Sequence, residues 1–471
     1  MKTTRTFLSV GGLLALATIG PVIGLQTVAC SKDEPPPSSQ NPIKVGVSVS
    51  LNGPYSGTGT GILAGIRAAA AVINARGGVL GRPIQLLEED DQSSNPERDG
   101  AARLKEVITK FRREKVSAII GPGASVQVGV AMGITYPNGG AKGAKIANND
   151  DATLLVSAWA TSPALTDQWP AFPDRFFYRT PPSDFYQRQA LWMRMKETLP
   201  TADGGTTAVP CERPFLVYGK DALGQTYSDY FTEKQVPDTY KIGVGTAAEN
   251  GGYTSTIAAF NQAQPRPTCV ALVTYADVSA GVIRAFRGAN ISTKYFATDA
   301  TFDDSFFGYV GDSSSIDMVG VEPDTIPADY PPFDQFKAIF RAHTPTADGG
   351  VLLDPPPYAS NAFDAMVLVA LAIQRSGQPD NPTEIRNSLV AVSRGEPEGT
   401  GVPVTPGTID TGLSALASGS QVNYAGASGP VDFDEKGDVK AGYVKWVLKP
   451  GFFQVLSDEN SRYKPTVFVD Q

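Results

Sequence analysis

The chain has 471 residues, more than one compact core usually holds, and this length predicts two or three domains. Its hydrophobic share of 41% and charged share of 19% are ordinary for a folded globular protein. The formal net charge is −8 and no basic stripe is evident, so we expect no nucleic-acid partner and no binding to an anionic membrane surface.

The N-terminus has the features of a targeting segment. A short basic start precedes an apolar stretch from Phe7 to Leu25, the order typical of an export signal. The sequence Thr27-Val28-Ala29-Cys30 resembles a bacterial lipobox, whose cysteine is lipidated and becomes the new N-terminus. We therefore expect residues 1–30 to be a lipoprotein signal peptide, Cys30 to carry the lipid, and the protein to be held to a membrane in the periplasm. Plain secretion remains the alternative. The proline-rich residues 31–42 predict a flexible tether.

The part that follows alternates strands and helices. Residues 43–49, 84–87 and 116–120 have the apolar patterns of strands, and helices are expected near 62–73 and 96–113. Repeated β-α-β units imply parallel sheets with helices on both faces, and ligands then lie at the carboxyl ends of the strands.

A second set of such units begins near Phe177. The fold class is therefore α/β, with two doubly wound parallel sheets. Three stretches rich in Gly, Pro, Thr and Ser look like surface insertions, at 136–152, 200–213 and 395–428. The second set comprises strands at 215–219, 241–245, 270–275 and 294–298 and helices near 183–198, 221–236, 253–264 and 277–289.

Two cysteines stand just before two of these strands. Export makes an oxidising compartment the expected environment, in which disulfides persist. If the strands after Cys211 and Cys269 are neighbours in a parallel sheet, both cysteines lie at the same edge and can pair. Two free buried thiols are the alternative.

Several segments, in order, resemble the type I periplasmic binding proteins of the leucine/isoleucine/valine-binding family. The resemblance implies two lobes joined by three hinge crossovers, near Arg179, Glu322 and Pro430. Lobe 1 then comprises 43–178 and 323–429, and lobe 2 comprises 179–322 and 430–457, with 458–471 as a C-terminal tail. The matching segments are Ile73 to Ile84 (INARGGVLGRPI) with Asp90-Asp91, Ile120 to Ser125, Ala160 to Thr166, Phe176 to Thr180, Asn361 to Met366 and Gly429 to Asp438.

The resemblance also implies a ligand site between the lobes. An amino acid presents a carboxylate and an ammonium, and both must be satisfied when they leave water. Positions matching Ser125, Ala160 and Thr161 contact these two groups in the family, and Ser125 is expected to begin a helix, whose N-terminus favours an anion. Asp299 matches the carboxylate that binds the ammonium, although the family has Glu there; Asp303 and Asp304 are nearby alternatives.

Aromatic residues complete the expected site. Tyr275 could pack over the ligand or be a plain core residue, and Tyr55 could rim the cleft or belong to a simple turn. Trp159 stands where the family has a small residue, and Leu223 where it often has an aromatic one, so both departures affect which ligand fits.

The implied function is the binding of a small polar solute, an amino acid above all, for delivery to an ABC transporter permease. A ligand-sensing or amide-binding receptor of the same fold is the alternative. We expect no enzyme activity, cofactor or metal, since the lone histidine, His343, belongs to a loop-like stretch and is expected at the surface. A remote alternative is an NAD-dependent dehydrogenase, because Gly59 to Ala64 (GTGILA) resembles a dinucleotide fingerprint. The loop before it, however, is too long for the tight turn that this motif needs.

Overall fold

The computed structural model describes residues 41–53, 55–92, 100–135, 152–167, 170–197, 210–245, 251–324, 329–344, 354–456 and 461–467. The predicted signal peptide, the lipidation of Cys30, nearly all of the tether and most of the insertions at 136–152 and 200–213 lie outside these residues.

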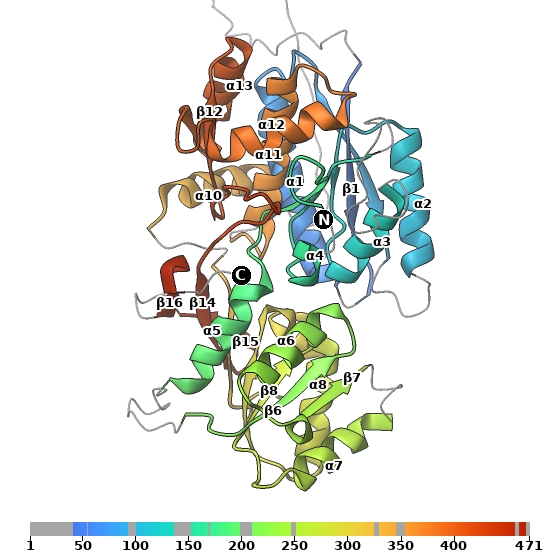
Figure 1. The fold of residues 1–471 in the computed structure, drawn as a ribbon, viewed down its shortest axis with the longest axis vertical. Helices are drawn as coiled ribbons and strands as arrows, with labels where there is room; N and C mark the ends of the chain where they lie inside the picture. Colours follow the sequence, from blue (N-terminus) through green and yellow to red (C-terminus); the bar gives the residue numbers. More distant parts are fainter. Residues whose placement is uncertain are drawn as a thin grey trace, which may run out of the picture. The chain divides into compact units, whose positions relative to one another are not determined.

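The first lobe is built on a five-stranded parallel sheet in the order β2-β1-β3-β4-β5. Buried side chains occur on both faces of β1, as is usual in a parallel sheet covered by helices. Helices α1 and α11 pack together on one side of the sheet, and α2 and α3 lie on the other (Figure 1). The strands are β1 (Ile43–Val49), β2 (Ile84–Asp90), β3 (Ile119–Ile120), β4 (Leu155–Ser157) and β5 (Phe177–Arg179), and the helices are α1 (Ser56–Ala75), α2 (Gly100–Arg113), α3 (Ser125–Thr135), α4 (Ala164–Asp167), α10 (Pro331–His343), α11 (Ala359–Ser376) and α12 (Pro382–Arg394).

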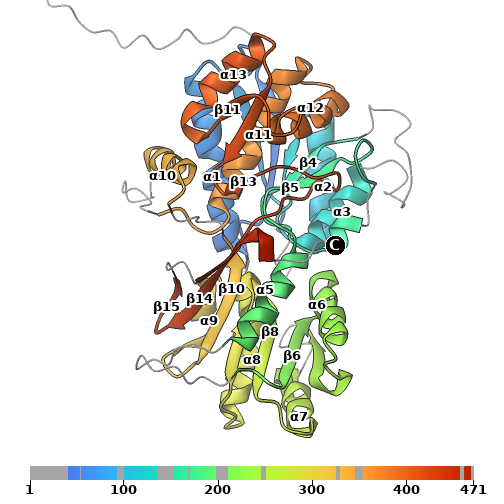
Figure 2. The same ribbon diagram turned by 60° about the vertical axis from the view of Figure 1, so that its left-hand side comes forward.

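The second lobe has a larger sheet, in the order β15-β14-β10-β9-β8-β6-β7. Its strands from β6 to β10 are parallel, and β14 and β15 extend the edge in antiparallel fashion beside β10 (Figure 2). The strands are β6 (Pro214–Gly219), β7 (Lys241–Val244), β8 (Cys269–Val273), β9 (Lys294–Ala297), β10 (Met318–Pro323), β14 (Tyr443–Lys449), β15 (Phe452–Val455) and β16 (Arg462–Tyr463), and the helices are α5 (Asp184–Lys196), α6 (Ala222–Glu233), α7 (Thr254–Gln262), α8 (Ala276–Gly288) and α9 (Ser305–Val310).

Three details differ from the expectations. Residues 395–428 are no loose insertion, because they form β11 (Val402–Val404), α13 (Ile409–Ala417) and β12 (Val422–Gly426), which pairs with β13 (Gly429–Pro430). Their apolar side chains pack on α11 and α12 in the core of lobe 1. Val431, Phe433 and Val439 also pack in that core, so the third crossover lies later than Pro430. Strand β16, within the expected tail, pairs with β14.

Cys211 and Cys269 form a disulfide, with their Cα atoms 5.7 Å apart. Strands β6 and β8 are neighbours, and Pro214 pairs with Cys269 in the parallel register. Both cysteines therefore lie at the amino end of this sheet, away from the carboxyl ends that carry the candidate site.

The glycine motif that resembles a dinucleotide fingerprint lies inside helix α1 and not in a strand-to-helix turn. A Cβ atom on Gly59 would lie 1.9 Å from the carbonyl oxygen of Ser50, and one on Gly65 would lie 2.2 Å from that of Ala359. These glycines let the backbone of α1 approach its neighbours, and this packing role explains the motif without a nucleotide.

Among the described residues, one helix, α1, is long and apolar enough to cross a membrane. Most of it is buried within lobe 1, as in a core helix.

Candidate ligand-binding site

A small cavity lies where residues of the two lobes meet. It has a volume of about 20 Å³, which is room for little more than one water molecule. A ligand of amino-acid size can therefore enter only if the lobes separate or the lining side chains move. The lining consists of Tyr55, Thr58, Trp159, Pro357 and Tyr358 from lobe 1 and Tyr275, Ala276, Asp299, Ala300, Phe302 and Asp303 from lobe 2.

Aromatic rings from both lobes form most of the wall. The ring of Tyr55 stands edge-on to Trp159, with centroids 5.2 Å apart, and lies 4.7 Å from the ring of Tyr275 in the other lobe. Trp159 also lies 6.3 Å from Tyr358. Tyr55 lies directly before helix α1 and Tyr275 directly before helix α8. The N-termini of these two helices therefore position both rings at the cavity. Such a wall suits apolar groups and, through the ring faces, cations.

Asp299 supplies the negative charge of the cavity. It follows strand β9, and its carboxylate accepts hydrogen bonds from the Gln187 side chain at 2.5 Å and from the Tyr358 hydroxyl. Burial raises the pKa of the Asp299 carboxyl, and the hydrogen bonds from Tyr358 and Gln187 lower it in part. Tyr358 belongs to lobe 1, so this carboxylate is bonded across the lobe boundary.

Tyr358 has an unusual backbone conformation that places its ring in the cavity. Its φ of 64° is in the left-handed region, which non-glycine residues rarely adopt. Such strain tends to persist where surrounding structure requires it, often at binding sites.

Asp184 is a second carboxylate next to the cavity, and sequence reasoning missed it. It is 1% exposed, and neither carboxylate oxygen has a partner with full hydrogen-bond geometry. Burial raises the pKa of the Asp184 carboxyl well above its usual range and the charge of Asp299 raises it further, although the nearby Thr161 hydroxyl lowers it. The Asp184 backbone N–H donates to the Thr161 carbonyl at 2.7 Å. Thr161, Asp184 and Asp299 are thus close neighbours.

Ser125, Ala160 and Thr161 lie beside the cavity but do not line it. The Ser125 hydroxyl accepts a hydrogen bond from the Ser162 backbone N–H at 3.1 Å, so it fixes the loop that carries Thr161. Ala160 is fully buried, and its backbone N–H donates to Ser157. Trp159 covers the turn before Ser125, because a Cβ on Gly123 would lie 2.8 Å from its ring. Leu223, the other departure from the family pattern, packs in the core of lobe 2.

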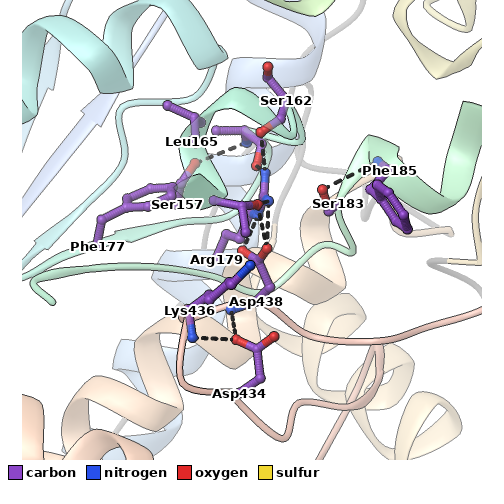
Figure 3. Close-up of polar contacts among 12 residues, drawn as sticks. Ser157, Ser162, Leu165, Phe177, Arg179, Ser183, Phe185, Asp434, Lys436 and Asp438 are labelled. Atoms are coloured by element: carbon purple, nitrogen blue, oxygen red, sulfur yellow. Dashed lines mark hydrogen bonds and ion pairs between the residues drawn. The ribbon is translucent and has the colours of Figure 1, made fainter. Parts of the chain in front are cut away.

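A buried ion pair holds this loop in place (Figure 3). Arg179, at the end of β5, donates to Asp438 from Nε at 2.7 Å and from Nη2 at 2.9 Å, and also to the Ser162 carbonyl at 2.8 Å. Burial opposes ionisation of Asp438, but the Arg179 charge and hydrogen bonds outweigh it and hold the pKa of this carboxyl below its usual value. Arg179, at the first crossover, is thereby bonded to the loop that contains Thr161 and Ser162. It is also bonded to Asp438, in the segment that leads into the third crossover.

A direct polar bond also crosses the cleft beside the aromatic wall. The Thr58 hydroxyl of helix α1 donates to Asp303 at 2.8 Å. Asp303 was expected only as an alternative to Asp299, and the structure places it on the cavity wall, whereas Asp304 is exposed.

The sequence carried only weak signals for the residues that were missed. Asp184 follows Ser183, whose side chain caps α5, and so resembles an ordinary helix start. Gln187 lies one turn later and is held by the Tyr227 hydroxyl at 2.9 Å. Tyr358 ends a run of prolines before an apolar helix, and this pattern predicts a loop and no more.

Within the described ranges, no group of three or more His, Cys, Asp and Glu side chains could hold a metal ion. His343 ends helix α10 with an exposed side chain, so it lies at the surface as expected but in a helix and not in a loop.

Comparison with known proteins agrees with the fold. The model of the periplasmic binding protein family matches residues 42–438. The chemotactic signal transduction system substrate-binding protein BasB of Halobacterium salinarum is 25% identical over 436 residues, covering 88% of this chain and 91% of that protein. The Leu/Ile/Val-binding protein of Escherichia coli strain K12 is 24% identical over 415 residues, covering 84% of this chain and 88% of that protein.

Solved structures share the fold at low sequence identity. The leucine-binding protein LivK of Thermotoga maritima has a TM-score of 0.63 at 17% identity, covering 90% of this chain and 100% of its own. A solute-binding protein of R. palustris in complex with 4-hydroxybenzoate has a TM-score of 0.62 at 16% identity, covering 90% of this chain and 97% of its own. The family match spans both lobes and every residue that lines the cavity, so the chain belongs to the type I periplasmic binding proteins, the extracytoplasmic solute-binding proteins related to the leucine/isoleucine/valine-binding family.

Proposed function

We propose that the protein binds an amino acid in the cleft between its lobes and delivers it to the permease of an ABC importer. The observation that carries this proposal is the position of Asp299, a partly buried carboxylate among aromatic rings of both lobes. A buried carboxylate is stable only with a partner, and a ligand ammonium is a suitable one. The aromatic rings then enclose the apolar part of the ligand.

The wall of lobe 1 suits the other end of an amino acid. Ser125 begins helix α3, and Thr161 lies in the loop that Ser125 and Arg179 hold. Hydroxyl groups and the N–H groups at a helix start are favourable partners for a carboxylate. We therefore assign the ligand carboxylate to the side of Ser125, Ala160 and Thr161, and the ammonium to Asp299 with Asp184 beside it.

Binding requires the cleft to open and close. Tyr358 and Thr58 of lobe 1 bond to Asp299 and Asp303 of lobe 2, and the remaining cavity is too small for an amino acid. A ligand that replaces these contacts and touches both lobes binds the closed form better than the open one. This difference in affinity shifts the population towards closure.

An aromatic acid such as the ligand of the R. palustris protein fits less well. Among the described residues that line the cavity there is no Lys or Arg to meet a lone carboxylate, whereas two aspartates are present. The charge of the cleft therefore favours an ammonium over a carboxylate as the main recognition group.

A second candidate function is that of a receptor, which the relationship to BasB favours because its name places it in a chemotactic signalling system. The binding step would be the same, and only the partner would differ. In cells, loss of an importer component abolishes uptake of the labelled ligand, whereas loss of a receptor abolishes the response and leaves uptake intact. For either role we propose that Cys30 anchors the protein to a membrane.

A thermal-shift screen against the common amino acids and small carboxylic acids tests the proposal. We expect at least one amino acid to raise the melting temperature by several degrees, and Asp299→Asn to abolish that shift. Asp229→Asn, the same change at an exposed position on α6, is the matched control and should keep the shift. A panel without any stabilising amino acid, or an unaltered shift in Asp299→Asn, would refute the assignment.

A further inference from the structure

Three carboxyl groups gather beside the cleft, more than the single ammonium of a neutral amino acid can partner. Asp299 follows β9, and the parallel register pairs Gly320 of β10 with Ala297 of β9. Glu322 lies two residues beyond Gly320 near the carboxyl end of β10, and Asp299 lies two residues beyond Ala297 at the start of a 3-10 helix. The two groups are near enough for the charge of Asp299 to act on Glu322. Glu322 is 3% exposed.

Asp184 adds a third carboxylate from a different element. It lies three residues before Gln187 on α5, and residues with this spacing share one face of a helix. The Gln187 side chain donates both to Asp299 and to the Val321 carbonyl. The face of α5 that carries Asp184 and Gln187 therefore packs against the carboxyl ends of β9 and β10. The buried carboxylate of Asp184, which has no hydrogen bond of full geometry, is therefore close to Asp299 and Glu322, and the charge of Asp299 acts on it.

No protein cation is available to neutralise these three groups within the described part of the chain. Arg179 acts on Asp184, but Asp438 already engages its guanidinium through two hydrogen bonds. The other groups that act on the three carboxyls carry no positive charge: they are hydroxyls, the Gln187 amide, backbone N–H groups and further acids. Burial raises the pKa of the Tyr358 hydroxyl, and the charges of Asp299, Asp184 and Glu322 raise it further.

Burial raises the pKa of all three carboxyls, so they tend to hold protons until a cation pairs with them. The α-ammonium of a neutral amino acid provides one such cation, whereas a ligand with a second cation can pair with a further carboxylate, and the surrounding aromatic rings also favour cations. We propose that the preferred ligand is a basic amino acid, whose α-ammonium lies at Asp299 and Asp184 and whose side-chain cation lies at Glu322. This inference rests on the proposed function and narrows its ligand class.

Calorimetric titration with two matched ligand pairs tests it. Lysine differs from norleucine, and ornithine from norvaline, mainly by the terminal ammonium, so the ratio of affinities within a pair isolates the second charge. We expect at least a tenfold preference for the basic member of one pair. The isosteric change Glu322→Gln should lower this ratio at least threefold, whereas Asp184→Asn should weaken both members of a pair alike, because both carry the α-ammonium. Glu233→Gln and Asp229→Asn, exposed positions on α6, should leave the ratio unchanged.

The possible failures are distinguishable. Equal affinity for both members of each pair, with neutral amino acids bound, would overturn this inference and leave the proposed function standing. An unchanged ratio in Glu322→Gln would also overturn it. Binding of no amino acid at all would refute both proposals together.

Discussion

The surroundings of Asp184 destabilise the charged form of its carboxyl group. Its carboxylate is buried, lacks full hydrogen bonds and faces the charge of Asp299, and these conditions raise its pKa. Because the folded state binds a proton on this group more tightly than the unfolded chain does, the group lowers the free energy of unfolding increasingly as pH rises above the usual range of a carboxyl.

Replacement of Asp184 by Asn should therefore stabilise the ligand-free protein while weakening binding. The amide keeps the shape and removes the charge, and we expect a gain of about 1 kcal/mol in the free energy of unfolding at neutral pH. Affinity for the amino acid should fall about tenfold. Urea unfolding and calorimetry on ligand-free protein measure both quantities.

The sign of the pH dependence provides an internal check. The advantage of Asp184→Asn should be larger at pH 8 than at pH 5, because the wild-type carboxyl is protonated more fully at the lower pH. Asp229→Asn should show neither the gain nor its pH dependence. A variant that is less stable than the wild type at pH 8 would contradict this account of Asp184.

Single residues differed in how well the sequence could place them. Tyr275 and Asp299 each follow a strand with a readable apolar pattern, and strand ends meet at one edge of a sheet, so their arrival at one cavity was predictable. Tyr358 was not, because its position depends on a left-handed backbone and on contacts across the lobes. Asp184 was not, because a helix start of this kind usually has no further role.

Whole elements were more predictable than single contacts. The helices and strands of lobe 2 appear at the expected places because their apolar periods differ clearly. Residues 395–428 were misjudged, since their many glycines and prolines suggested a loop. Val404, Ile409 and Val422 are nevertheless buried there, and the packing on α11 and α12 that stabilises them is not a local signal.

Helix α1 depends on glycine for its close contact with α11, and a substitution of Gly65 tests how much this contact contributes to stability. Gly65→Ala places a methyl group against the carbonyl of Ala359, and we expect a loss of about 2 kcal/mol in the free energy of unfolding. Gly129→Ala, within helix α3, meets no atom within 4 Å and should be neutral or stabilising by up to about 1 kcal/mol.

Chemical denaturation of the two variants under the same conditions gives the comparison. If Gly65→Ala were as stable as Gly129→Ala, the close approach of α1 and α11 would not be important for stability, and the packing role assigned to Gly65 would be wrong.

At the scale of the whole molecule, the two lobes each have their own core, and the cleft residues come from segments far apart in the chain. Lobe 1 supplies Tyr55, Trp159 and Tyr358, and lobe 2 supplies Tyr275 and Asp299. The aromatic wall takes rings from both lobes, and the Asp299 carboxylate comes from lobe 2. If the proposed function holds, recognition of an ammonium depends on both lobes at once.

The proposed function requires that the cleft recognise its ligand through an ammonium that pairs with Asp299. One titration series tests this requirement most directly, on protein that has been unfolded and refolded to remove any bound solute. The amino acid that gives the largest shift in melting temperature is compared by calorimetry with the amine that lacks its α-carboxylate and with the acid that lacks its α-ammonium. The account predicts that the amino acid binds with one site per chain, that the amine retains part of this affinity, and that Asp299→Asn loses it. Binding of the acid or of 4-hydroxybenzoate more tightly than any compound with an α-ammonium, unaffected by Asp299→Asn, would contradict it.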